Sequence, residues 1–97
     1  LRKLDHKVLN SLLEHEIKLY LLLLISYAAD QEFSGVEFGV LCRALGPEFS
    51  AKDLLTASGK FAGLGLGKIS LSEKPCLKKT TLVSFKPNFQ FQKASSL

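Results

Sequence analysis

The sequence predicts an α+β domain in which three to four helices precede a β-hairpin. Apolar residues recur at helical spacing up to about residue 64, whereas after Gly67 apolar and polar residues alternate as in strands. The 97 residues are enough for one domain. We expect a single domain over 1–97, with its core at about 6–86 and a partly ordered tail at 87–97.

Two helices are expected at the start of the chain. Asp5 is a candidate N-cap for a short helix from about His6 to Leu13, and a second helix follows from Glu14 to Ala29. Acidic residues in the first turn of the second helix are favourable because the helix dipole is positive there. This helix is apolar almost all round, so we expect it to be covered on two sides, either as the central core helix or as part of a subunit interface.

The next two helices are separated by a tight turn. The segment "VEFGVLCRALG" predicts a third helix over 36–45 that stops at Gly46. Ser50 is the expected N-cap of a fourth helix, with Asp53 in the capping-box position. The apolar face of this helix is formed by Leu54, Ala57, Phe61 and Leu64. Two helices joined by a few residues with glycine at the turn indicate a helix-turn-helix.

The last third of the sequence predicts a hairpin. The segments "KISLSE" (68–73) and "TTLVSFKP" (80–87) are the expected strands, and "KPCLKK" between them forms a basic tip. Phe89 and Phe91 fall on alternate positions in the tail, so we expect the tail to dock as an edge strand.

The stretch "FSAKDLLTASGKFAGLGLGKISLS" resembles the corresponding stretch of winged helix-turn-helix domains. The resemblance is carried by Ser50, Leu54, Ala57, Phe61, Gly65, Leu66 and Ile69, and it extends over about residues 6–86. It implies duplex DNA binding, with residues 50–64 as the recognition helix and the hairpin as the wing, in a protein of replication, partition or transcription. It does not identify a subfamily.

The resemblance also implies which residues contact DNA. Lys52, Thr56 and Lys60 would face the major groove, and Ser50 and Ala51 would offer backbone N–H groups to a phosphate. The wing tip would add three lysines. The predicted DNA-binding residues are therefore Ser50, Ala51, Lys52, Thr56, Lys60, Lys74, Lys78 and Lys79. The net charge of +4 favours an anionic partner without requiring one.

A second interpretation is a winged-helix module that binds protein in a multisubunit assembly. The surplus of apolar residues in the first helices suits a homodimer or another domain of a longer protein. Charge placement discriminates between the two. One continuous basic surface over the fourth helix and the wing favours DNA, whereas interruption by Glu37, Glu48 and Asp53 favours protein.

Other functions find little support in the sequence. Gly63, Gly65 and Gly67 follow a helix and precede a strand, the reverse of the order in phosphate-binding loops, so they predict a helix-to-strand corner. His6 and His15 have no recognisable nucleophile partner, so we predict no enzyme and no cofactor.

Neither a metal site nor a membrane span is predicted. Cys42 and Cys76 do not form a metal-binding motif. The apolar run at 17–29, about 13 residues, is shorter than the roughly 20 that a membrane span needs. We expect an intracellular protein with no membrane partner.

Overall fold

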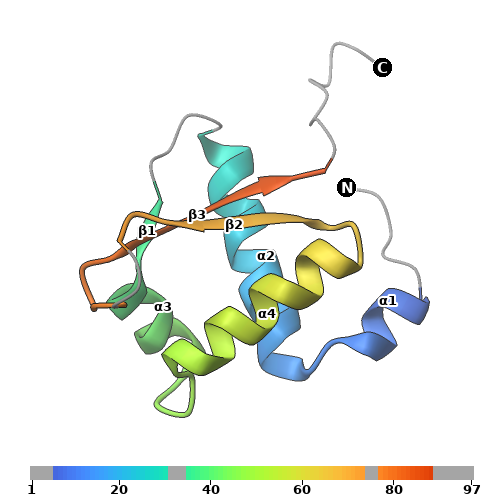
Figure 1. The fold of residues 1–97 in the computed structure, drawn as a ribbon, viewed down its shortest axis with the longest axis horizontal. Helices are drawn as coiled ribbons and strands as arrows, with labels where there is room; N and C mark the ends of the chain where they lie inside the picture. The colour runs from blue at the N-terminus through green and yellow to red at the C-terminus, as the bar shows by residue number, and fades with distance from the viewer. Residues whose placement is uncertain (1–5, 31–34, 74–76, 89–97) are drawn as a thin grey trace.

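The computed structural model describes residues 6–30, 35–73 and 77–88, which form an α+β fold as the sequence predicts. In chain order the elements are α1 (His6–Ser11), α2 (Glu14–Ala29), β1 (Val36–Glu37), α3 (Phe38–Leu45), α4 (Ala51–Gly63), β2 (Gly67–Leu71) and β3 (Leu82–Pro87) (Figure 1). The strands make an antiparallel sheet in the order β1-β3-β2. The expected tail strand with Phe89 and Phe91 lies outside the described residues.

The third helix begins later than its sequence pattern predicts. Val36 and Glu37 form the short strand β1, which pairs with Val83 and Leu82 of β3. A strand of two residues is too short to show a period of two, so only the pairing with β3 reveals it. As a result β3 is the central strand of the sheet. Helix α3 begins directly after β1, at one edge of the sheet.

The core lies between α2, α4 and one face of the sheet. The Tyr20 ring of α2 packs edge-on against Phe61 of α4 and Phe85 of β3, with ring centres 5.5 and 5.8 Å apart. These geometries suit aromatic pairs, which gain from edge-to-face packing in addition to burial. Because one residue from each layer takes part, this cluster holds α4 in place against α2 and the sheet.

Within the described residues the core covers one side of α2, and the expected cover of its other side by a subunit interface stays a prediction. Leu19 and Leu23 are completely buried, but Leu21 and Ile25 are 42% and 65% exposed. Sequence periodicity missed this difference because nearly every position of the helix is apolar. A single wide face of α2 therefore enters the core, and the opposite face remains on the surface.

The corner between α4 and β2 is built as the glycine pattern predicts. The N–H of Gly65 donates to the carbonyl of Ala62, and the N–H of Leu66 donates to the carbonyl of Phe61. Together with φ of +73° at Gly65, these two bonds make a Schellman C-cap. Gly67 then allows close approach of β3, since a Cβ at this position would lie 2.6 Å from the Lys86 carbonyl oxygen.

Candidate nucleic-acid interface

The N-terminus of α4 is closed by a capping box between Ser50 and Asp53. The Ser50 N–H donates to Oδ2 of Asp53 at 2.9 Å, and the Asp53 N–H donates to the Ser50 hydroxyl at 3.4 Å. The hydrogen bonds from the backbone and side chain of Ser50 lower the pKa of Asp53. The Asp53 carboxylate therefore takes the N–H that the sequence analysis assigned to a phosphate, so this role of Ser50 does not fit the structure. The N–H of Ala51 keeps its predicted role, which the structure does not test.

The outward face of α4 carries two of the predicted groove residues. At 100° per residue, Lys52 lies about 170° and Thr56 about 130° from the centre of the buried stripe formed by Leu54, Ala57 and Phe61. Both side chains are exposed. Both residues lie on the surface as predicted, because the apolar stripe of a regular helix determines its opposite face.

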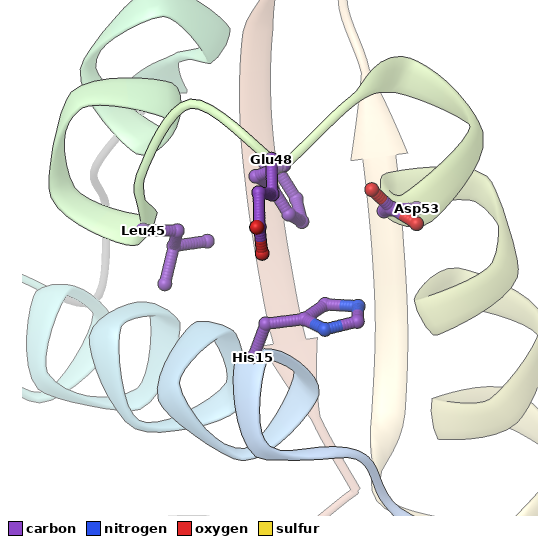
Figure 2. Close-up of a pocket in the computed structure, with 5 residues that line it drawn as sticks. His15, Leu45, Glu48 and Asp53 are labelled. Carbon is purple, nitrogen blue, oxygen red and sulfur yellow. The ribbon is translucent and has the colours of Figure 1, made fainter.

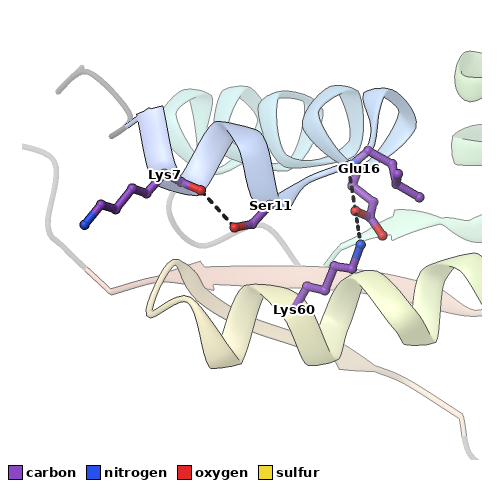
Figure 3. A network of polar contacts seen from close by, with 5 residues as sticks. Lys7, Ser11, Glu16 and Lys60 are labelled. Atoms are coloured by element: carbon purple, nitrogen blue, oxygen red, sulfur yellow. Dashed lines mark hydrogen bonds and ion pairs between the residues drawn. The ribbon is translucent and has the colours of Figure 1, made fainter.

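Lys60 does not lie on this outward face, which corrects the prediction. It is only about 90° from the centre of the buried stripe, on the side toward α2. Its ammonium nitrogen Nζ lies 2.9 Å from Oε1 of Glu16, and the Glu16 side chain is only 1% exposed (Figure 3). The charge of Lys60 is thus engaged within the protein, because a buried carboxylate needs a cation beside it.

The hairpin end is tethered to the start of α3. The Gly39 N–H donates to the Lys79 carbonyl and the Phe38 N–H donates to the Thr81 carbonyl, each at 2.9 Å. These are N–H groups that α3 itself cannot satisfy in its first turn. The side chains of Lys78 and Lys79 are exposed, so the tether fixes the backbone and leaves both charges on the surface.

A buried threonine organises the hairpin from within. The Thr81 hydroxyl accepts the N–H of Lys78 at 2.8 Å and donates to a carboxylate oxygen of Glu73 at 3.2 Å. It therefore links both arms of the hairpin near the tip. Lys74, the third predicted wing lysine, lies outside the described residues.

Gly39 has a positioning role that the sequence pattern did not predict. A Cβ at residue 39 would lie 3.2 Å from the Lys79 carbonyl oxygen, so the glycine permits close approach of the hairpin. Glycine is unfavourable inside a helix. Its presence at position 39 within a helical pattern was therefore the sequence signal that could have indicated a close contact.

A shallow pocket of about 260 Å³ lies beside the N-terminus of α4. Figure 2 shows the ring of His15, from the start of α2, pointing toward the space between Glu48 and Asp53. The imidazole also packs edge-on against Phe49, with ring centres 6.1 Å apart. His15 is thus partly buried, and the carboxylates of Glu48 and Asp53 place negative charge at the N-terminus of α4.

The pocket offers little chemistry beyond this charge. In the described part of the chain, no three His, Cys, Asp or Glu side chains are grouped so that they could hold a metal ion. Among the described residues, no helix is long and apolar enough to cross a membrane. Comparisons with known protein families, curated proteins and solved structures found no match to this chain.

Proposed function

We propose that this domain binds duplex DNA as a winged helix-turn-helix domain, with α4 as its recognition helix. The succession α2, β1, α3, α4, β2, β3 and the sheet order β1-β3-β2 support this layout. The tight turn between α3 and α4 supports it as well, because a helix-turn-helix presents its second helix to the major groove.

The observation that carries the proposal is the placement of exposed cations around α4 and the hairpin. Lys52 stands on the face of α4 opposite the core, and Lys78 and Lys79 stand on the tethered hairpin. Figure 1 shows the start of α4, α3 and the end of the hairpin toward the same end of the long axis of the molecule. The proposed contacts among the described residues are therefore the backbone N–H of Ala51 and the side chains of Lys52, Thr56, Lys78 and Lys79, and Lys60 is left out.

The binding is expected to be dominated by phosphate contacts and to depend weakly on base sequence. The exposed face of α4 offers Lys52 and Thr56 and no arginine, asparagine or glutamine, the side chains best suited to bidentate base contacts. Asp53, which interacts electrostatically with Lys52, and Glu48 at the N-terminus of α4 repel phosphates and reduce the affinity.

The apolar surface of α2 favours the second candidate function, a module that binds protein. Leu21 and Ile25 are one helical turn apart and both exposed, and two large apolar side chains stacked in this way suit a partner helix. The carboxylates of Glu48 and Asp53 beside His15 place negative charge at the N-terminus of α4, which also supports the protein-binding interpretation.

Titration with a random-sequence duplex at two salt concentrations tests the DNA proposal. We expect an affinity that falls steeply with salt, and replacement of Lys78 and Lys79 by alanine should reduce the slope of log K against log salt by about 1.8. Replacing Lys18 and Arg43, both exposed and on other helices, removes the same charge and serves as the control. Undetectable binding at low salt would rule out DNA, and equal effects of the two double variants would remove the wing from the interface.

A further inference from the structure

The outer face of the β2–β3 ribbon carries a pair of lysines that the proposed interface does not use. Lys68 lies directly opposite Lys86, and Ser70 lies opposite Ser84. Ile69 and Phe85 between them are buried, so alternation along the strands places both lysines on the face away from the core. Both lysine side chains are exposed.

The two lysines are held close together by the register. The Asn88 N–H donates to the Leu66 carbonyl and the Ser72 N–H donates to the Leu82 carbonyl, at 3.1 and 3.0 Å. Because antiparallel pairs alternate between bonded and non-bonded types, Lys68 and Lys86 form a bonded pair, with Cα atoms about 5.5 Å apart.

This arrangement is unfavourable for the domain by itself. Like charges directly opposite one another on a sheet destabilise it. Among the described residues, neither lysine forms an ion pair with a carboxylate. An anionic ligand between the two ammonium groups would relieve the repulsion.

We propose that Lys68 and Lys86 bind the phosphate backbone of a second DNA duplex, so that the domain bridges two duplexes. This inference rests on the proposed function, in which the first duplex lies on α4. The outer face of the ribbon and the outward face of α4 both point away from a shared core, in which Phe61 of α4 packs edge-on against Phe85 of β3 with ring centres 6.0 Å apart. In Figure 1 the ribbon crosses above α4. One straight duplex against Lys52 therefore does not reach Lys68 and Lys86.

The surroundings of the pair suit a phosphate backbone. Ser70 and Ser84 next to the lysines are small, and the Ser84 hydroxyl donates to the Ser70 carbonyl at 3.5 Å. Glu37 shares this face, but it lies opposite Leu82, four residues along β3 from Lys86. Four residues of a strand span about 13 Å, so Glu37 is farther from Lys86 than the screening length of about 8 Å at physiological salt.

Sedimentation velocity of the whole chain with a short labelled duplex in excess tests the inference by stoichiometry. At low salt we expect two duplexes per chain for the native protein and one for the variant with Lys68→Gln and Lys86→Gln. The control variant with Lys18→Gln and Arg43→Gln has the same net charge as the ribbon variant and should still bind two duplexes. The ribbon variant should also melt a few degrees higher than the native protein, because the repulsion is gone.

The outcomes separate this inference from the proposed function. If the native protein binds one duplex, or if the ribbon variant still binds two, the bridging role is refuted. Binding on α4 then stands if the variant with Lys52→Gln, Lys78→Gln and Lys79→Gln loses a duplex. If the variant with Lys52→Gln, Lys78→Gln and Lys79→Gln keeps one duplex and the ribbon variant also keeps one, both surfaces bind DNA. If the native protein binds no duplex, both proposals fail together.

Discussion

Replacing Lys60 by methionine tests the assignment of this residue to the interior rather than to DNA. Methionine keeps most of the aliphatic stem and removes the charge. The Glu16 carboxylate is only 1% exposed. Without Lys60, the donor that remains to it among the described residues is the N–H of Leu13, at 2.8 Å. Its second oxygen, Oε2, already has no partner among those residues. The variant thus leaves a buried carboxylate without a counter-charge.

The magnitude follows from the burial of the two partners. Breaking a fully buried ion pair costs about 3–5 kcal/mol, whereas an exposed pair contributes about 0.2–1 kcal/mol. Here Glu16 is buried and Lys60 is 34% exposed, so water partly screens the pair. We therefore expect a loss of about 2 kcal/mol, which corresponds to a fall in melting temperature of about 8–16 °C for a domain of this size.

Urea unfolding followed by circular dichroism measures this loss. Lys52→Met is the matched control, because Lys52 is on the same helix and exposed, and its substitution should change stability by less than about 0.5 kcal/mol. Adding Glu16→Gln to the Lys60→Met variant should recover part of the loss, since the buried group is then neutral. Equal effects of Lys60→Met and Lys52→Met would refute the buried ion pair. A loss of DNA affinity larger for Lys60→Met than for Lys52→Met, measured where both variants are folded, would return Lys60 to the interface.

Three further substitutions test the local architecture. Gly67→Ala should destabilise the domain by more than about 2 kcal/mol in the same unfolding assay, because φ of Gly67 is +153° and the added Cβ would meet the Lys86 carbonyl. A variant as stable as the native protein would contradict the corner geometry. Ser50→Ala should cost about 1 kcal/mol by loss of the N-cap, and a neutral effect would show that Asp53 caps α4 alone. The pKa of Asp53 is lowered in the folded state, so its contribution to stability is present above about pH 4 and is lost as the pH falls below it. The Asp53→Asn variant should therefore flatten the acid side of a plot of melting temperature against pH. An unchanged profile would argue against the capping box.

Much of the fold could be predicted because it depends on local signals. The cap at Ser50, the apolar stripe of α4 and the glycine corner each involve residues within a few positions of one another, where helix geometry and backbone preferences act directly. The capping box and the corner are present as predicted.

The candidate site was predicted only where a single element determines it. Lys52 and Thr56 are outward because the stripe of their own helix defines the opposite face. Lys60 is on the flank of the same helix, and its environment depends on Glu16, 44 residues earlier in the chain. Periodicity within α4 cannot reveal a partner on α2.

The sequence by itself determined the helices, the hairpin and the corner between them, because backbone conformation and apolar period are properties of neighbouring residues. Only the tertiary structure decided that Val36 and Glu37 form a strand, that Lys60 is paired, and that Lys68 faces Lys86. Each of these depends on which segments meet across the core or the sheet, and the burial and charge of a side chain are determined by that contact.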